Sequence, residues 1–421
     1  MSATSSNAAR LNVIIVGAGL CGLSAAISIA LAGHQVSIFE AHPGAHEFGA
    51  GLQTSPNGTR IYTEWGLSDS IRSIATMPEI YQIRRFDGAI LAQRQDYDAE
   101  VPRRYGYPLW LMHRVDLQAV LLRRATELGV EIFYSSNVVD VNCGEPYIQL
   151  EDGSRRRGDF VVVADGVWSK LRSVVLGQQI DAEPTGDIAY RITIDRPQVE
   201  DEEVLAWMKQ SRVQIWVGRE AHAVAYSVRG STQMNLVLLA TQDLPGDGGR
   251  VRGNVEEPRQ RFEGWDPLLT KLLSYVEKVD KWRLMSVPAL PTWRSKNGTV
   301  VLSGDCCHAI LPYMAQGLNM ALEDAATLGT LMRYVKTRNQ LSKATSLYEK
   351  IRIARTSQLL AETRAIRNEF HLQPGVAREK RDAHLMESFE ESDWAYPKSQ
   401  SWVWPYDAFD EAEKAYRCDP Y

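Results

Sequence analysis

Residues 12–40 read NVIIVGAGLCGLSAAISIALAGHQVSIFE, and this stretch decides the fold of the first part of the chain. Asn12 to Val16 is a β-branched run that ends at a glycine, which predicts a buried strand. The Ala- and Ile-rich stretch from Gly22 to Ala32 predicts a helix, and Gln35 to Phe39 predicts a second strand. Strand, helix and strand in this order form a βαβ unit of a parallel sheet.

The turn between the first strand and the helix carries three glycines in the pattern G-x-G-x-x-G. Gly17 permits the tight turn, Gly19 lets a pyrophosphate approach the backbone, and Gly22 lets the helix pack closely on the sheet. The N–H groups that begin the helix attract phosphates, and Glu40 at the end of the second strand accepts hydrogen bonds from a ribose. The unit therefore predicts a dinucleotide site, although the pattern alone does not choose between NAD and FAD.

Composition argues against several classes of protein. A chain of 421 residues fits two domains, or one domain with a large insertion. Its net charge of -5 comes without a basic tail or stripe, so we expect no nucleic-acid partner. The apolar stretch 23–32 is too short to span a bilayer, and the polar residues 1–10 lack the order of a secretory signal. The 5 cysteines include no C-x-x-C pair, which favours a reducing compartment, and we expect the cytoplasm.

The rest of the chain predicts a second sheet and a helical end. Residues 81–95 and 191–237 show strand-like alternation with many aromatic residues, which predicts a separate antiparallel sheet. Residues 323–389 are mostly helical in pattern, and 401–406 predict an aromatic strap packed on the body of the protein.

We therefore expect an α/β fold: a Rossmann-like dinucleotide-binding domain, an inserted antiparallel β-sheet domain for the substrate, and a helical C-terminal region. The expected boundaries are 10–75, 100–180 and 285–365 for the first domain, 76–99 and 181–284 for the second, and 366–421 for the helical and aromatic tail.

Two later strands are followed by an acidic residue beside a glycine, at Asp165-Gly166 and at Gly304-Asp305. Ligands of open parallel sheets bind at the carboxyl ends of the strands, so both segments can bring backbone and carboxylate against one ligand. Pro312 lies in the loop after the second segment. The N–H groups of the next helix start could face an electron-rich flavin edge, and the residues that begin this helix are Gly317, Leu318 and Asn319.

Together these segments resemble the single-component FAD-dependent aromatic hydroxylases, especially the salicylate hydroxylase-like branch. The resemblance runs from about Val13 to about Ala361. The chain departs from the family by having Ala315 where a first glycine is commoner, and Cys306-Cys307 where alanines are usual. In that family these segments hold FAD, and the matching residues here are Gly17, Gly19, Gly22, Glu40, Arg114, Asp165, Gly304, Asp305, Gly317, Leu318 and Asn319.

The resemblance also implies a reaction. NADPH or NADH would bind transiently and reduce FAD, and O2 would then form a flavin C4a-hydroperoxide that delivers one oxygen atom to an electron-rich aromatic ring. The enzyme would act as a monomer or a homodimer without a metal, since His42 and His46 lack convincing ligand spacing. Two alternatives stay open: an indole-type epoxidase of secondary metabolism, or a flavin oxidase or reductase that inserts no oxygen. A dinucleotide-binding regulatory protein without turnover is a third reading.

The substrate site is the part that the sequence specifies least. Tyr190-Arg191 resembles a pair that lies over the active site in this branch, and Pro312 would lie against the flavin and the substrate. An arginine there can hold a carboxylate or phenolate, although a strand-end ion pair explains it as well. The other candidate substrate residues are Gln53, Trp216, His222 and Tyr226. Gln53, together with Asn57, would line the cavity from the flavin side. Trp216 and Tyr226 can equally be packing residues, and His222 is a possible base, although a satisfied histidine of the core or surface is the commoner case.

Overall fold

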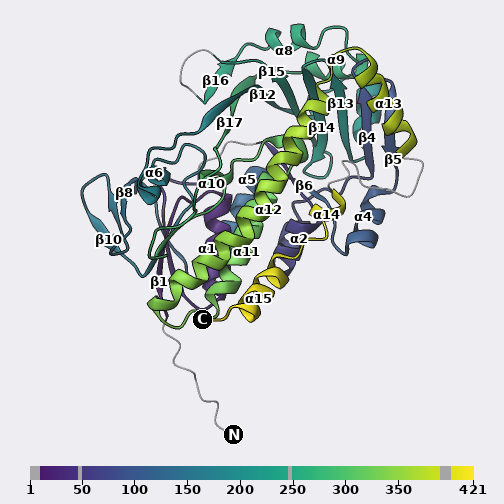
Figure 1. The fold of residues 1–421 in the computed structure, drawn as a ribbon. Helices are drawn as coiled ribbons and strands as arrows, with labels where there is room; N and C mark the ends of the chain where they lie inside the picture. Colours follow the sequence, from purple (N-terminus) through teal and green to yellow (C-terminus); the bar gives the residue numbers. More distant parts are fainter. Residues whose placement is uncertain (1–9, 46–49, 245–248, 389–399) are drawn as a thin grey trace.

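The computed structural model describes residues 10–45, 50–244, 249–388 and 400–421. The amino-terminal segment 1–9 and His46 lie outside the described residues. Four sheets are found in the described part, and helices cover them (Figure 1). Among the helices described there, none is long and apolar enough to cross a membrane.

A parallel sheet of five strands carries the predicted βαβ unit. Its strands are runs of Val, Ile and Phe, a composition typical of strands that are buried on both faces. In spatial order they are β18 (Val300–Leu302), β11 (Phe160–Val163), β1 (Asn12–Val16), β2 (Gln35–Phe39) and β7 (Glu131–Phe133).

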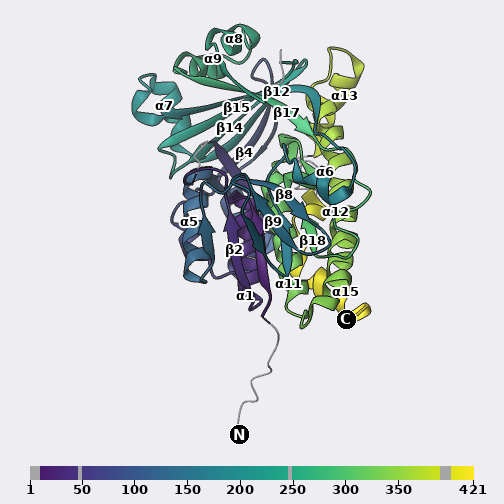
Figure 2. The ribbon, with the colours of Figure 1, turned by 90° about the vertical axis from the view of Figure 1, so that its left-hand side faces the viewer.

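Helix α1 (Leu20–Leu31) packs on this sheet and is buried along most of its length. It begins two residues before the predicted start because Gly19 is its N-cap. Helices α5 (Arg114–Glu127) and α11 (Gly317–Met332) pack against α1, while a small sheet lies over the opposite face of the parallel strands (Figures 1 and 2). The strands of the small sheet are β10 (Arg155–Arg157), β9 (Tyr147–Leu150) and β8 (Val138–Asn142).

The second large sheet has eight strands, and its pairs are antiparallel except for β4 with β13. Residues 80–94 and 183–286 supply all of these strands. In spatial order they are β16 (Arg250–Gly253), β17 (Val279–Ser286), β12 (Glu183–Asp195), β15 (Gln233–Thr241), β14 (Ala221–Val228), β13 (Arg212–Gly218), β4 (Ile80–Arg85) and β5 (Ile90–Arg94).

The two faces of this sheet have different neighbours. One face, here called the outer face, packs its apolar side chains against α7 (Glu202–Lys209), α8 (Glu256–Arg261) and α9 (Pro267–Ser274). Figure 2 shows these three helices beside the sheet. The other, the inner face, is turned toward the parallel sheet and the last helices of the chain. Since side chains alternate along a strand, neighbouring residues of one strand belong to different faces.

Helix α12 (Leu341–Phe370) is 30 residues long and runs from beside α11 to the eight-stranded sheet (Figure 1). After it come α13 (Val376–Ser388), α14 (Gln400–Val403) and α15 (Ala408–Cys418). The predicted aromatic strap lies at α14 and just after it, where Val403 and Trp404 are buried in the core under the inner face.

The remaining elements are short. A two-stranded sheet joins β3 (Gly51–Thr54) and β6 (Trp110–His113). The other helices are α2 (Pro56–Glu64), α3 (Ser68–Arg72), α4 (Tyr97–Tyr105), α6 (Leu171–Leu176), α10 (Asp305–His308) and the 3-10 turns η1 (Arg196–Gln198), η2 (Pro312–Met314) and η3 (Arg338–Gln340). The predicted fold class, a Rossmann-like parallel sheet with an antiparallel sheet and a helical end, is confirmed.

Candidate active site

A cavity of about 300 Å³ lies between the carboxyl ends of the parallel strands and the inner face of the eight-stranded sheet. Segments that are far apart in the sequence meet around it. Of the residues singled out from the sequence, those that line it are Gly19, Gln53, Arg114, Gly166, Arg191, Tyr226, Asp305, Pro312, Ala315, Gly317 and Leu318.

The glycine turn after β1 has the shape that a dinucleotide needs. Gly17 has a φ of +99°, and a Cβ on Gly22 would lie 1.9 Å from the Gly17 carbonyl oxygen, so both positions require glycine. A Cβ on Gly19, by contrast, would meet no atom within 4 Å, which leaves open space beside the start of α1. Glu40 borders the same turn, because its carboxylate accepts the Ala18 N–H at 2.7 Å. A pyrophosphate fits the open space, and a ribose fits beside Glu40.

Two carboxylates stand at neighbouring strand ends. Asp165 follows β11, and its Oδ1 is buried without a hydrogen-bond partner. Asp305 follows β18 and lines the cavity without a hydrogen bond from any described side chain. Enclosure by protein raises the pKa of both carboxyl groups. Buried acceptors without donors fit a ligand that brings hydroxyl groups, as the ribityl chain of FAD does.

Two arginines face the same cavity. Arg114 is the first residue of α5, and Arg191 lies on β12. Neither guanidinium makes a hydrogen bond or an ion pair to a residue that the structure describes, and Arg191 only stacks on Trp282, at 5.1 Å from the ring centre. Burial lowers the pKa of both guanidinium groups, and the charge of Arg114 adds to the shift at Arg191. Unpaired cations in an enclosed cavity favour anionic ligands.

The loop before α11 closes the cavity from the side of the last helices. Pro312, Gly317 and Leu318 line it. Asn319 does not: its Nδ2 donates to the Ala315 carbonyl at 2.9 Å, and its Oδ1 accepts the Ser55 N–H at 3.2 Å. The Asn319 side chain thus fastens the loop, and only its backbone N–H, at the start of α11, is left to serve the predicted contact with the flavin.

Comparison with known proteins identifies the family. Residues 10–363 match the family model described as an FAD binding domain. The FAD-dependent monooxygenase OpS4 of Beauveria bassiana (strain ARSEF 2860) is 40% identical over 414 residues, which are 96% of this chain and 97% of that protein. The chain belongs to the FAD-dependent monooxygenases.

Other comparisons agree with the resemblance seen in the motifs, which is confirmed. A 3-hydroxybenzoate 6-hydroxylase of Polaromonas naphthalenivorans (strain CJ2) is 32% identical over 378 residues, covering 89% of this monooxygenase and 91% of that protein. The solved structure of a salicylate hydroxylase substrate complex has the same fold, with a TM-score of 0.79 at 21% identity, over 96% of this chain and 98% of the other.

The substrate side of the monooxygenase's cavity is made by alternate residues of the inner face. On β14 these are His222, Val224 and Tyr226, which point to the same side because they are two residues apart. Arg191 is on the same face of β12. His222 lines a smaller adjoining cavity of about 60 Å³, which shares Gln53 and other wall residues with the main one.

Two of the predicted residues lie elsewhere. Tyr190 is next to Arg191 on β12 and so points to the outer face, where its ring is 1% exposed and packs near Lys281. Trp216 is fully buried on the outer face, and its Nε1–H donates to Asp266 at 2.8 Å. Predicting them as cavity residues was wrong, because the sequence pattern did not fix which face each residue takes.

The smaller cavity has aromatic walls that sequence reasoning missed. Its wall residues come from segments that are far apart along the chain, and no motif joins them. Period-two alternation could have identified the strand residue Tyr81, but the helix and loop residues carry no such signal. The missed aromatic residues are Tyr81, Tyr97, Tyr313, Phe370 and Trp404.

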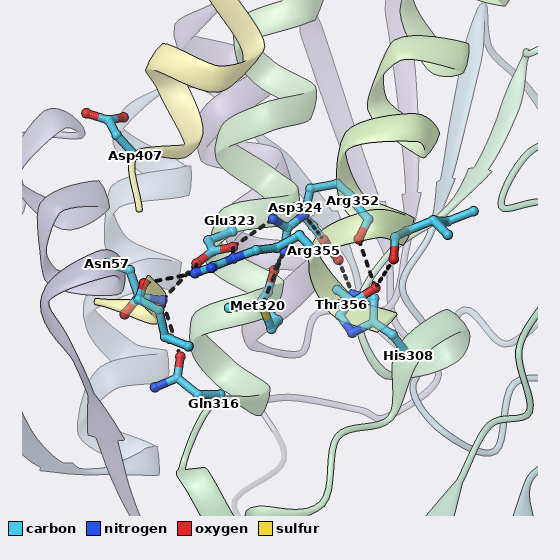
Figure 3. Close-up of polar contacts among 12 residues, drawn as sticks. Asn57, His308, Gln316, Met320, Glu323, Asp324, Arg352, Arg355, Thr356 and Asp407 are labelled. Carbon is cyan, nitrogen blue, oxygen red and sulfur yellow. Dashed lines mark hydrogen bonds and ion pairs between the residues drawn. The ribbon is translucent and has the colours of Figure 1, made fainter. Parts of the chain in front are cut away.

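A buried ion network lies behind both cavities (Figure 3). Glu323 and Asp324 of α11 are 0% exposed, and each binds the guanidinium of Arg352 of α12 at 2.7 Å. Asp324 also accepts the Gly304 N–H at 2.9 Å. The network thus holds the strand end that presents Asp305.

The other end of the network reaches the smaller cavity. Glu323 accepts from Nδ2 of Asn57 at 2.8 Å, and the same Nδ2 lies 3.2 Å from Oε1 of Gln316, a wall residue (Figure 3). Asn57 is therefore a support behind the wall, not a cavity residue as expected. Both sides of the site depend on the same buried charges.

Proposed function

We propose that this monooxygenase hydroxylates a small, electron-rich aromatic substrate that carries a carboxylate or phenolate, with NAD(P)H as the reductant and O2 as the oxygen source. The observation that carries the proposal is the guanidinium of Arg191, which faces the cavity and has no ion-pair partner among the described residues. A buried positive charge without a partner is unfavourable, so an anionic group of the substrate would stabilise it in the cavity. Relatives named for hydroxybenzoate and 6-hydroxynicotinate hydroxylation support this substrate class.

The residues of the cofactor side would hold FAD, which supplies the hydride acceptor and the oxygen-activating group when it is bound. Gly19 and the first N–H groups of α1 would hold the pyrophosphate, and Glu40 the adenosine ribose. Asp165 and Asp305 would accept hydrogen bonds from hydroxyl groups of the cofactor. Gly317 and Leu318 would lie against its ring at the start of α11.

The residues of the substrate side would orient the ring and move a proton. Arg191 would bind the anionic group, and Pro312 with Val224 would exclude water from the ring. Burial holds the pKa of His222 well below 6.5, so its imidazole is neutral and can accept a proton from a substrate hydroxyl. A ring that loses this proton becomes more electron-rich, which favours attack by an electrophilic oxygen.

The expected domain boundaries belong to the same proposal. Residues 10–75, 100–180 and 285–365 would bind FAD, 76–99 and 181–284 would bind the substrate, and 366–421 would close the site. The position of Trp404 in the wall of the smaller cavity supports a part for the carboxyl-terminal segment. We also propose a cytoplasmic monomer or homodimer that binds NADPH or NADH only transiently.

The test is an NAD(P)H oxidation assay on the FAD-loaded protein with phenols, hydroxybenzoates, aminohydroxybenzoates and indoles, with product mass read in parallel. We expect a hydroxybenzoate-like acid to stimulate oxidation and to gain one oxygen atom. A product from an uncharged indole, with no response to acids, would contradict the role of Arg191. Peroxide release with every compound and no oxygenated product would favour an oxidase.

A further inference from the structure

His222 is joined to a second histidine that the proposed function does not use. Its ring is 1% exposed on β14, and its Nδ1 lies 2.8 Å from Nε2 of His371, the C-cap residue directly after α12. Nε2 of His222 has no hydrogen-bond partner among the described residues, and the ring lines the smaller cavity. A strand of the sheet and the end of a distant helix therefore meet at one hydrogen bond.

The chain of contacts continues to the surface. Nδ1 of His371 lies 3.3 Å from Oγ1 of Thr241, the last residue of β15. Thr241 is exposed, and its hydroxyl oxygen accepts a hydrogen bond from Nη2 of Arg367 at 2.8 Å. Three side chains thus connect the buried cavity wall with solvent.

The direction of these hydrogen bonds decides what His222 can do. Two neutral imidazoles at 2.8 Å share one proton, so one nitrogen donates and the other accepts. The Thr241 oxygen has two lone pairs, which can accept from Arg367 and from His371, while its own O–H donates to water. In the arrangement in which His371 donates its Nδ1–H to Thr241, Nε2 of His371 accepts the Nδ1–H of His222, and Nε2 of His222 keeps a lone pair toward the cavity.

Burial, with the neighbouring charge of Arg367, keeps both histidines of the pair neutral. Burial lowers the pKa of His371 to about 4 and that of His222 well below its usual range, and the Arg367 guanidinium lowers both further. Asp187 pairs with Arg367 at 2.6 Å and offsets part of its effect. The other charged or titratable groups that face the pair are Arg261, Glu220 and Tyr313, whose ring lies 5.3 Å from that of His222.

We infer that His371 is a positioning residue: it fixes the tautomer of His222 that offers Nε2 to the substrate, and with Thr241 it gives the substrate's proton a path to solvent. The path, but not the tautomer, rests on the proposed function. The substrate O–H bond breaks and its electron pair stays on the oxygen. The proton binds Nε2 of His222, the Nδ1–H of His222 moves to His371, and the Nδ1–H of His371 moves through Thr241 to water. The shift reverses when the product hydroxyl regains its proton, so the tautomers are restored.

The tautomer can be read without turnover. We would record nitrogen NMR spectra of the FAD-loaded protein labelled with 15N-histidine, without substrate. The wild type should show His222 protonated at Nδ1 only. His371→Leu removes the acceptor and should shift His222 toward the Nε2–H tautomer, whereas His371→Gln keeps an acceptor oxygen and should preserve the wild-type tautomer. An Nε2–H tautomer in the wild type, or an unchanged tautomer in His371→Leu, would overturn the positioning role.

The path is tested by pH profiles with the aromatic substrate found above. In His371→Gln and Thr241→Val we expect kcat to fall about tenfold near neutral pH, below the 10²-fold or more that removal of a general base itself causes. KM should not change. The rate should recover above the pKa of the substrate hydroxyl, because the substrate then arrives ionised. His384→Gln, on the exposed side of α13, is the matched control and should behave as the wild type.

Two results would contradict the path. One is an equal loss of kcat at every pH together with a lowered melting temperature, which would mean a structural role. The other is unchanged kcat in both variants. If no aromatic compound is oxygenated, the proposed function and the path fail together, but the NMR result still decides whether His371 positions His222.

Discussion

The cofactor side and the substrate side of the cavity are built differently. The cofactor side consists largely of backbone shape: the glycine turn at 17–22, the start of α1 and the strand ends before Asp165 and Asp305. The substrate side consists of side chains on the inner face of the eight-stranded sheet, such as Arg191. Backbone shape leaves a short local motif in the sequence, whereas a side-chain wall depends on the face that each residue takes. The first can be recognised from residues alone, and the second needs the structure.

The largest effect should come from the backbone of the cofactor side. A Cβ at Gly22 would collide with the Gly17 carbonyl, so Gly22→Ala should abolish FAD binding and lower the melting temperature of the apoprotein. Gly19→Ala meets no protein atom and should leave the apoprotein as stable as the wild type while weakening FAD binding. Flavin absorbance and thermal melts of both apoproteins measure this. An equal fall in melting temperature in the two apoproteins would mean that Gly19 and Gly22 do not differ in this way.

The second-largest effect should come from the buried ion network, which supports both the cofactor side and the substrate side of the cavity. Arg352→Met leaves Glu323 and Asp324 buried without their shared partner, which should cost about 3–5 kcal/mol of unfolding free energy. Denaturant unfolding measures it, and Arg123→Met, which removes an exposed arginine of α5 that faces the exposed Glu127, is the control. Arg355 already pairs with Glu323 at 3.0 Å and His308 contacts Asp324, so a loss below about 1 kcal/mol would mean that these partners compensate for the loss of Arg352.

The same network predicts how stability responds to acid. Burial alone would raise the pKa of Glu323, but the charges of Arg355 and Arg352 hold it below its usual value. A carboxylate with a lowered pKa in the folded state adds stability above its unfolded pKa of about 4.3, and this is lost as pH falls through the folded value. Glu323→Gln should therefore lower the melting temperature at neutral pH and reduce its dependence on pH below about 4. An unchanged acid profile would exclude Glu323 as a contributor.

A smaller effect should distinguish the substrate side from the cofactor side, because a change at Arg191 should lower activity and leave FAD binding intact. Arg191→Met should keep FAD bound and lower kcat/KM for an aromatic acid about 100-fold, because a charged hydrogen bond is worth up to about 3 kcal/mol. Arg250→Met is the matched control, since Arg250 also stacks on Trp282 but does not line the cavity. Flavin content and steady-state rates give the result. Unchanged kcat/KM would remove Arg191 from the substrate site.

The smallest effects should distinguish the two faces of the sheet. Trp216→Phe loses its hydrogen bond to Asp266 on the outer face, which should cost about 1 kcal/mol of stability and leave kcat/KM unchanged. Tyr226→Phe on the inner face should change kcat/KM up to about tenfold with little effect on stability. The reverse pattern, with activity lost in Trp216→Phe alone, would show that the faces are not separate in function.

The sequence predicted the parts of this molecule that local rules determine. The βαβ unit follows from a β-branched run, three glycines and an acid within about 30 residues, and the two strand ends follow from the same rule at other strands. The same rules do not determine how a polar side chain at a helix start is used, because the side chain of Asn319 could bind a ligand or fasten its own loop. Only the contacts to Ala315 and Ser55 distinguish these uses.

The side-chain walls could not be predicted for a different physical reason. Tyr190 and Arg191 are neighbours, and a shift of one residue in strand register exchanges their faces. Trp216 and His222 lie on two paired strands, and the register places Trp216 opposite Ala223 instead of His222. His371 and Trp404 join the site only because α12 and α14 fold back onto the sheet. No short-range pattern records contacts over such distances.

The alternation along β12 has a consequence for how such an enzyme can diversify. Ala189 and Arg191 touch whatever enters the cavity, while Ile188 and Tyr190 attach the strand to the outer layer. A lineage can therefore exchange an inner residue and acquire a new specificity without first losing its scaffold. Because substrate contact and scaffold packing fall on alternate residues of one strand, a single mutation can change substrate specificity or stability without changing the other.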